Sequence, residues 1–261
     1  MNSDLSLRAV SEHVVEIRLQ RPERLNALGV ALSAALQDAV SEVGARRARV
    51  LLLRGTGRAF CAGADLKERR GMALTERIAH NAAINAAVDA LAAAPCVTIA
   101  AINGLALGGG CELAMACDFR IAAAGIQIGL TESRVGAIPG AGGTQRLPRL
   151  VGLGRALQMM LTGEPVTAER AEAIGLVHEV VALELLDERT RALAALLAAR
   201  SPAGLRIIKK LAYQGTEMPL AEGLKAERAG VAAMLASADY AEGLAAFAEK
   251  RPPRFAGESA P

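Results

Sequence analysis

Two short segments each place a glutamate beside a glycine-rich stretch, and they hold the residues best suited to catalysis. The first covers residues 108–112 (GGGCE) and the second covers residues 132–143 (ESRVGAIPGAGG). Consecutive glycines before a helix leave backbone N–H groups open at the helix N-terminus, where they can bind an oxyanion. Glu112 falls in the first turn of that predicted helix, and Glu132 follows 20 residues later. The two carboxyl groups could therefore act as an acid–base pair beside a polarised carbonyl.

A third segment, residues 60–67 (FCAGADLK), follows a predicted buried strand. Its small residues leave backbone N–H groups open to a ligand. Each segment also has a purely structural explanation: a glycine turn, a glutamate that interacts with the helix dipole, or a turn with a surface glutamate. The occurrence of all three segments in this order indicates a functional site far more specifically than any one of them does.

Several other chemistries have no matching motif. The chain contains no GxxxxGK(S/T), no HExxH, no Cys/His cluster and no GxSxG, and residues 140–145 (GAGGTQ) fail the GxGxxG pattern. We therefore expect no metal site and no separate cofactor. The four cysteines form no CxxC pair and lie in apolar or glycine-rich settings, so we expect buried, reduced thiols.

The composition predicts a globular protein with a large core. The chain has 261 residues, of which 52% are hydrophobic and 22% are charged. A net charge of +3 is too small to indicate a nucleic-acid partner. The basic segments 67–70 and 206–210 are interpreted mainly as solvated helix faces. Residues 1–10 lack an apolar signal core, and charged, polar and glycine residues interrupt the apolar stretch 82–117, so we expect a soluble cytoplasmic protein.

Strands and helices alternate in the first part of the chain, which predicts an α/β architecture. From residue 152 onward the pattern is nearly all helical, and we place a boundary near Arg200, giving a core over 1–200 and a helical region over 201–261. Asn26 is expected to cap the first helix. The expected strands are 5–10, 14–19, 50–53, 96–102, 119–122 and 127–130; residues 55–65 are expected to form a loop; and the expected helices are 28–43, 75–93, 111–116, 154–161, 168–174, 185–199, 202–214, 220–236 and 239–250.

The three segments together resemble the enoyl-CoA hydratase/isomerase (crotonase) superfamily. The resemblance covers essentially the whole chain. It rests on RP at 21–22, LNAL at 25–28, the segments 60–67, 101–118 and 138–147, LTG at 161–163, AIGLV at 173–177, and FAEKR at 247–251. It implies a spiral of ββα turns followed by a helical C-terminal region that assembles homo-trimers, often paired into hexamers.

The resemblance also implies a role for individual residues. The backbone N–H groups of Ala64 and Gly109 would bind the thioester oxygen of an acyl-CoA. In a hydratase, Glu112 would position and deprotonate water, and Glu132 would deliver a proton to C2. The coenzyme A contacts of the family fall on Arg24, Ala62, the run Ala64, Asp65, Leu66 and Lys67, and on Lys250.

The leading hypothesis is an enoyl-CoA hydratase that forms a 3-hydroxyacyl-CoA. The segments 64–69 (ADLKER) and 128–132 (IGLTE) look most like the 3-methylglutaconyl-CoA hydratase branch, whose substrate needs a cation for its distal carboxylate; Arg69, Arg70 and Arg77 are the candidates. Alternatives are an isomerase, which needs Glu132 alone, a non-catalytic acyl-CoA-binding homologue, and an RNA-binding homologue. RNA binding in that branch uses a row of lysines, of which only Lys67 is retained here.

Overall fold

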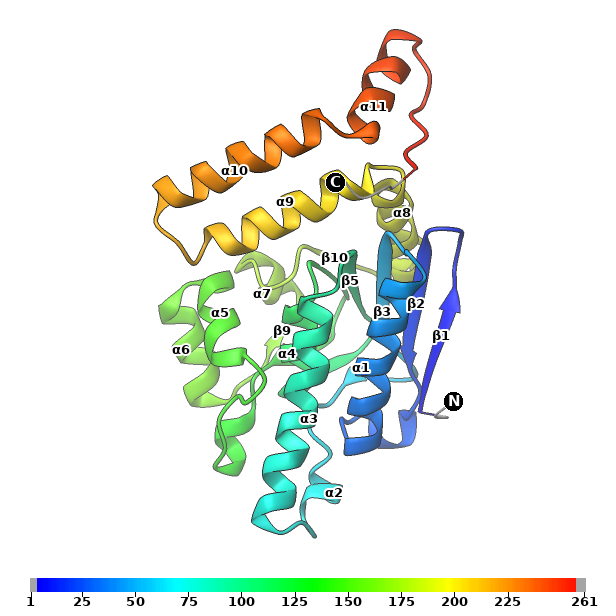
Figure 1. Cartoon of the computed structure of the whole chain (residues 1–261). Coiled ribbons are helices and arrows are strands. Elements are labelled where there is room, and N and C mark those ends of the chain that lie inside the picture. The colour runs from blue at the N-terminus through cyan, green and yellow to red at the C-terminus, as the bar shows by residue number, and fades with distance from the viewer. Residues whose placement is uncertain (1–3, 257–261) are drawn as a thin grey trace.

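The computed structural model describes residues 4–256, so the outer ends of the predicted segments 1–200 and 201–261 lie outside it. Within these residues a six-stranded sheet forms the centre, in the order β1-β2-β3-β5-β7-β10 (Figure 1). Only the β1–β2 pair is antiparallel in this sheet. Its strands are β1 (Leu5–Ala9), β2 (Val14–Leu19), β3 (Val50–Gly55), β5 (Val97–Ile102), β7 (Phe119–Ala123) and β10 (Glu179–Val181).

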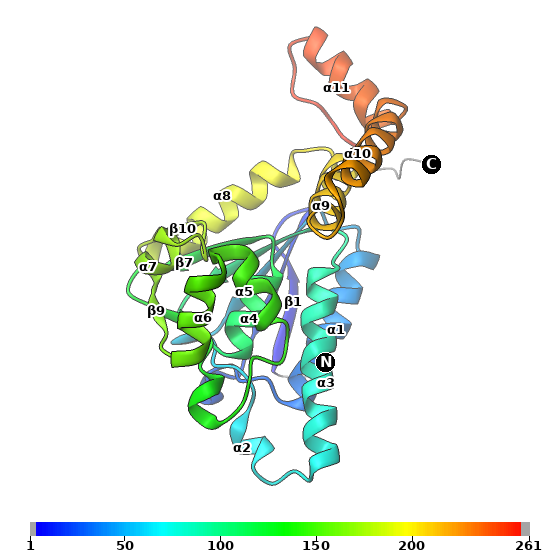
Figure 2. The same cartoon turned by 90° about the vertical axis from the view of Figure 1, so that its left-hand side faces the viewer.

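The central strands were predicted because they are continuous apolar runs. β3 and β5 are buried along nearly their whole length, as expected for parallel strands covered on both faces. Helices α1 (Val30–Ala45) and α3 (Leu74–Ala92) pack on one face of the sheet, and α8 (Leu186–Ala198) packs on the other (Figure 2). On the α8 side, Ala194 lies in a small core with Val50 and Ile99.

A second sheet of four short strands was mostly missed by the sequence analysis. In the described chain its order is β4-β6-β8-β9. The strands are β4 (Ala59–Cys61), β6 (Leu105–Leu107), β8 (Gln127–Gly129) and β9 (Val166–Thr167). β4 lies inside the segment 55–65, so the prediction of a loop there was wrong in part. Strands of two or three residues are too short to show a periodic pattern.

The two sheets together form the expected spiral. β3 and β4 belong to different sheets and are followed by α2 (Leu66–Arg69) and α3. β5 and β6 are followed by α4 (Gly109–Ala116), and β7 and β8 by the short 3-10 helix η2 (Glu132–Val135) and α5 (Gly143–Val151). Each turn thus contributes one strand to each sheet and then a helix, and the α/β fold is confirmed.

Asn26 does not cap the first helix, contrary to the prediction. The N-cap residue of α1 is Gly29, and Asn26 is fully buried with a left-handed φ of 56°. Its side chain accepts from the backbone N–H of Arg21 and donates to the carbonyl oxygens of Thr56 and Ala59. Asn26 therefore ties the end of β2 to the β3–β4 turn.

The C-terminal part is less uniformly helical than predicted, because β9 and β10 interrupt it. Helix α5 was missed: it begins after glycines and contains Pro148, both of which obscure a helical pattern. The antiparallel pair α9 (Pro202–Gly215) and α10 (Leu220–Leu235) lies at one end of the molecule, with α11 (Ala238–Ala248) beyond it (Figure 1). The remaining helices are α6 (Leu153–Thr162) and α7 (Ala168–Ala173), and the short 3-10 helices are η1 (Pro22–Arg24) and η3 (Leu183–Leu185).

One residue of the basic segment 206–210 attaches α9 to the core. The Lys209 Nζ atom donates to the carbonyl oxygens of Ala94 and Cys96 and lies 2.8 Å from Oδ2 of Asp118. The interpretation of the whole segment as a solvated face was therefore wrong for Lys209. The four cysteines are free and buried, as predicted.

Candidate active site

A cavity of about 110 Å³ lies among α2, α3, α4 and the segment that contains η2. It is small beside the roughly 300–1,000 Å³ of typical pockets for drug-sized ligands. Most of its wall is apolar or glycine. The lining residues are Ala62, Gly63, Ala64, Leu66, Arg69, Asn81, Ile84, Gly108, Gly109, Glu112, Thr131, Glu132, Val135, Ala137, Ile138, Gly140 and Ala141.

Glu112 is held at the cavity by a segment far away in sequence. Its side chain is buried, and Oε1 accepts from the backbone N–H groups of Ala141 at 2.7 Å and Gly143 at 2.8 Å. Oε2 has no hydrogen-bond partner within residues 4–256. Burial raises the pKa of Glu112, and the two backbone donors partly offset this effect. One oxygen is thus fixed in place while the other can accept a proton.

Glu132 begins η2 and lines the same cavity. Its Oε2 atom is buried without a hydrogen-bond partner in the described chain. Burial, followed by a smaller repulsive effect of Glu112, raises the pKa of Glu132 to about 7. A carboxyl group with this pKa exists in both protonation states near neutral pH and can exchange protons with a substrate.

The two predicted oxyanion donors lie close together. A Cβ added to Gly109 would lie 3.6 Å from the backbone nitrogen of Ala64, and one added to Gly63 would lie 3.1 Å from that of Gly109. Gly63 has a φ of +94°, which disfavours a side chain there. In the described part of the chain, neither the Ala64 N–H nor the Gly109 N–H donates a hydrogen bond. Both donors therefore remain available to one acceptor in the cavity.

Glycine is also required where α4 meets the short strand β4. A side chain on Gly110 would overlap the backbone carbonyl oxygen of Cys61. The first turn of α4 consequently packs directly against the backbone of β4. This contact brings the motif at 60–67 next to the glycine triplet, 40 and more residues later in the sequence.

The other residues expected to bind coenzyme A surround the start of α2. Asp65 is buried; its side chain accepts from the backbone N–H groups of Lys67 and Glu68 and pairs with Arg21 at 3.3 Å. Nη1 of Arg24 lies 3.9 Å from Oδ1 of Asp65. Asp65 is therefore an N-cap that organises this region, while Leu66 and Lys67 are exposed and Ala62 and Ala64 line the cavity.

Arg24, Asp65 and Lys67 lie near the start of α2 but do not line the cavity, and Lys250 lies in a different part of the molecule. It follows α11 directly, and both views place α11 at the end of the molecule opposite to α2 (Figures 1 and 2). Within one chain its ammonium group is therefore remote from Glu112 and Glu132.

Several lining residues were not identified from sequence. Asn81 and Ile84 come from α3, and Val135 and Ile138 from the segment around η2. Their residue types carry no distinctive chemical signal, and only the fold places them beside the carboxylates. Arg69 was named as one of three alternative cations and as part of the basic segment 67–70. The interpretation of that segment as a solvated helix face was wrong for Arg69, which lines the cavity and has a buried Nη2 atom.

Comparison with known proteins identifies the family. The sequence model described as "Enoyl-CoA hydratase/isomerase" matches residues 9–258. The chain belongs to the enoyl-CoA hydratase/isomerase family. A Bacillus anthracis protein described as an enoyl-CoA hydratase has a solved structure that is 42% identical in sequence, with a TM-score of 0.95, and the match covers 98% of this chain and 100% of that one.

Two mammalian relatives match over a similar extent. Enoyl-CoA hydratase domain-containing protein 2 of Bos taurus is 40% identical over 97% of this chain and 88% of its own length. Methylglutaconyl-CoA hydratase of Mus musculus is 39% identical over 98% of this chain and 84% of its own length. Membership of the family accounts for the order of the three motifs and indicates a hydratase or isomerase that acts on acyl-CoA.

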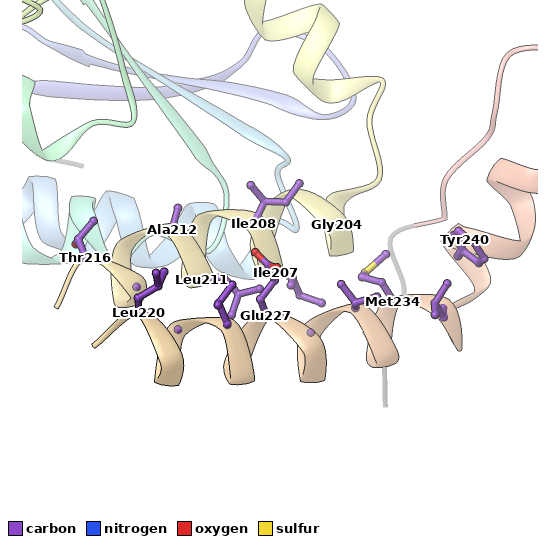
Figure 3. Close-up of a pocket in the computed structure, with 16 residues that line it drawn as sticks. Gly204, Ile207, Ile208, Leu211, Ala212, Thr216, Leu220, Glu227, Met234 and Tyr240 are labelled. Atoms are coloured by element: carbon purple, nitrogen blue, oxygen red, sulfur yellow. The ribbon is translucent and has the colours of Figure 1, made fainter. Parts of the chain in front are cut away.

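A larger groove of about 820 Å³ lies between α9 and α10. Figure 3 shows Ile207 and Leu211 of α9 and Met234 of α10 among its lining side chains. The groove contains neither Glu112 nor Glu132, and most of its lining is apolar. Glu227 is the one carboxylate in its lining, so despite its size the groove does not hold a pair of carboxyl groups like that of the smaller cavity.

Two further properties concern the described residues only. Residues 4–256 contain no group of three or more His, Cys, Asp or Glu side chains placed to hold a metal ion. No helix in this range is both long enough and apolar enough to cross a bilayer.

Proposed function

We propose that this chain is an enoyl-CoA hydratase that adds water across the C2=C3 bond of a trans-2-enoyl-CoA. The observation that supports this most strongly is the convergence of four groups on one cavity. These are the carboxyl groups of Glu112 and Glu132 and the free backbone N–H groups of Ala64 and Gly109. Coenzyme A is then part of the substrate rather than a separate cofactor.

In the proposed reaction the thioester oxygen accepts hydrogen bonds from the Ala64 and Gly109 N–H groups. These fixed donors stabilise the negative charge that develops on the oxygen as water attacks C3, an effect of about 3–4 kcal/mol per donor in other enzymes. Oε2 of Glu112 accepts a proton from the attacking water. Glu132 transfers its own proton to C2, which completes the 3-hydroxyacyl product.

The different environments of the two carboxyl groups suit these different roles. Glu112 receives two backbone hydrogen bonds, which favour its ionised form and allow it to act as a base. Glu132 has no such support at Oε2, and its pKa of about 7 keeps part of the population protonated at neutral pH. When their environments give two carboxyl groups different pKa values, one group can act as the acid and the other as the base.

The proposal is tested by the hydration of crotonyl-CoA, which is measured as the loss of the absorbance of the conjugated thioester. Glu112→Gln and Glu132→Gln should each lower kcat by about 10²–10⁴-fold. Both variants should stay folded and still bind acyl-CoA. Glu184→Gln, at an exposed position in η3, serves as the matched control and should behave like the wild type.

Near-full activity in either active-site variant would contradict the assigned roles. If Glu112→Gln lost hydration but still moved the double bond of a 3-enoyl-CoA, isomerisation would be the better description of the enzyme. The relative named methylglutaconyl-CoA hydratase makes 3-methylglutaconyl-CoA a second substrate to assay beside crotonyl-CoA.

We further propose that α9, α10 and α11 carry the subunit interface of a homo-trimer or hexamer. Large apolar side chains are exposed on all three helices, including Ile208 at 65%, Leu220 at 77% and Phe247 at 86%. Ile208 and Leu220 belong to the mostly apolar groove between α9 and α10, and apolar surface gathered in this way is characteristic of interaction sites. Light scattering coupled to size-exclusion chromatography tests the proposal, and a monomer at micromolar concentration would contradict it.

A further inference from the structure

The turn that fixes Glu112 depends on a sharp bend at Gly142. The two N–H groups that bind Oε1 of Glu112 belong to Ala141 and Gly143, and Gly143 is the first residue of α5. Backbone N–H groups at a helix N-terminus favour a bound carboxylate. Gly142 lies between the two donors and has a φ of +97°. Both donors reach the same oxygen only while this turn keeps its shape.

Arg146, in the first turn of α5, reaches back to the same turn. Its Nη1 atom donates to the carbonyl oxygen of Ala141 at 3.0 Å. A Cβ built on Gly142 would overlap this Nη1 atom, so glycine at 142 leaves the space that the guanidinium group occupies. Nη2 of Arg146 lies 3.4 Å from Oδ1 of Asp89 on α3, and the side chain is only 26% exposed. Arg146 therefore joins the turn to both α5 and α3.

Hydrogen bonds to carbonyl oxygens orient this turn. Since a peptide group is planar, a bond to its carbonyl oxygen also fixes the direction of its N–H group. Asn81 donates to the carbonyl oxygen of Gly140 at 3.3 Å, on the peptide group whose N–H is that of Ala141. The next peptide group, between residues 141 and 142, separates the two donors. Within residues 4–256 its only hydrogen bond is the one from Arg146.

Arg146 also brings a positive charge near Glu112. Burial raises the pKa of Glu112, and the N–H groups of Gly143 and Ala141, followed by the charge of Arg146, lower it. The groups that favour the ionised form thus all come from residues 141–146. The other titratable or charged groups that line the cavity or adjoin Glu112 are Arg69 of α2, Glu132 of η2 and the Cys111 thiol of α4, whereas α3 contributes the uncharged Asn81 and Ile84.

We propose that Arg146 is a positioning residue for Glu112. By holding the carbonyl group of Ala141, it keeps both N–H donors on Oε1 of Glu112 and leaves Oε2 free to accept a proton. This inference rests on the proposed function, because it assumes that Glu112 acts as the base. Arg146 does not line the cavity, so it should influence the reaction through Glu112 and not through contact with the acyl group.

A double-mutant cycle with crotonyl-CoA tests this dependence. Arg146→Met removes the hydrogen bond and the charge but keeps an unbranched side chain. It should lower kcat by about 10- to 100-fold in the wild type, since a displacement of about 1 Å at a catalytic group can cost this much. In the Glu112→Gln background the same replacement should have little further effect, because the group that it positions is already lost. KM should change little in either background.

The pH dependence of kcat/KM is a second readout, which a general loss of stability would not change. Glu112 must be ionised to accept a proton, so activity falls at low pH as it becomes protonated. Loss of the Arg146 charge and of the fixed donors should raise the pKa of Glu112. The acid limb should therefore move to higher pH in Arg146→Met. Arg146→Lys keeps the charge but not the forked donor group, and should recover part of kcat and of the wild-type acid limb.

Arg149→Met is the matched control. Arg149 lies on the same helix and is exposed, and its Nη1 atom donates to the carbonyl oxygen of Gln145 within α5. This variant should keep the kcat and the acid limb of the wild type. The inference is overturned if Arg146→Met keeps both, if its effect is equal in the two backgrounds, or if Arg149→Met reproduces it. If Arg146→Met does not fold, the cycle with Arg146→Lys decides by the same criteria.

Hydrogen exchange separates failure of this inference from failure of the proposed function. Without substrate, mass spectrometry over residues 138–147 should show faster exchange at the Ala141 and Gly143 N–H groups in Arg146→Met than in the wild type or Arg149→Met. Hydration by the wild type with unchanged exchange in Arg146→Met would reject the role of Arg146 while the hydratase function stands. Faster exchange confined to this segment, in a protein that hydrates neither crotonyl-CoA nor 3-methylglutaconyl-CoA, would support the role of Arg146 in holding the turn and reject the hydratase function.

Discussion

Replacement of Glu132 by glutamine should change how the stability of the protein depends on pH. The carboxyl group has a pKa of about 7 in the folded protein, against a usual value of 4.5, because burial disfavours its charge. The folded protein therefore binds this proton more tightly than the unfolded chain. The resulting stabilisation is complete below pH 4.5 and is lost progressively as the pH rises through 7. Glutamine resembles the neutral carboxyl and does not titrate.

The size of the effect follows from the two pKa values. At about 1.4 kcal/mol per pKa unit, this titration lowers the free energy of unfolding by at most about 2.5 kcal/mol between pH 5 and pH 8. Glu132 is only partly buried, and solvent screening reduces the expected value to about 1–2 kcal/mol. The wild type should therefore lose this much more stability than Glu132→Gln over that interval.

Urea unfolding at pH 5 and pH 8 measures the difference directly. Protein concentration is kept constant, because association of subunits would make the apparent stability depend on it. Groups that titrate in both proteins, such as His178, cancel when the two pH dependences are subtracted. Glu184→Gln, the exposed control, should follow the wild type. Equal pH dependences for the wild type and Glu132→Gln would refute the argument that burial raises the pKa of Glu132.

Three further predictions concern the scaffold. Gly110→Ala would press a methyl group against the carbonyl oxygen of Cys61, and the free energy of unfolding should fall by about 2 kcal/mol. Calorimetry should then give a melting temperature about 4–8 °C lower. An unchanged melting temperature would contradict the close approach of α4 and β4. Lys209→Met removes the ammonium group that joins Asp118 to α9, at a cost of about 1–3 kcal/mol, and limited proteolysis should cut faster at residues 199–201. Cleavage at the rate of the wild type would show that α9 does not depend on this contact. The four buried thiols should not react with Ellman's reagent in the native protein at pH 8 but should all react in denaturant, and rapid reaction of the native protein would contradict their burial.

Local patterns in the sequence were sufficient for the larger elements. The apolar runs at β3 and β5 and the helical spacing in α3 and α10 are carried by residues that are neighbours in the chain. Hydrophobic periodicity predicts which face of a strand or helix is buried, even when the element that packs against this face is unknown. The glycines and glutamates of the three motifs could likewise be identified, because residue type and order alone distinguish them.

The geometry of the candidate site depended on contacts between distant segments. Glu112 is fixed by the backbone N–H groups of Ala141 and Gly143, about 30 residues away, and no local pattern predicts such a contact. Asn26 illustrates the same limit: its residue type favours a helix cap, yet three longer-range hydrogen bonds hold it elsewhere. At this position the free energy gained from the tertiary hydrogen bonds outweighs the local preference of asparagine for a helix cap.

The sequence by itself determined the residue types available for chemistry, the α/β class and the order of the motifs. The tertiary structure alone decided that β4 and β6 join a second sheet, that Lys250 lies far from the cavity, and that Arg69 has a buried atom without a partner. The physical reason is that residue type and periodicity are local properties. Burial, pKa and the presence of a partner are set by segments that meet only when the chain folds.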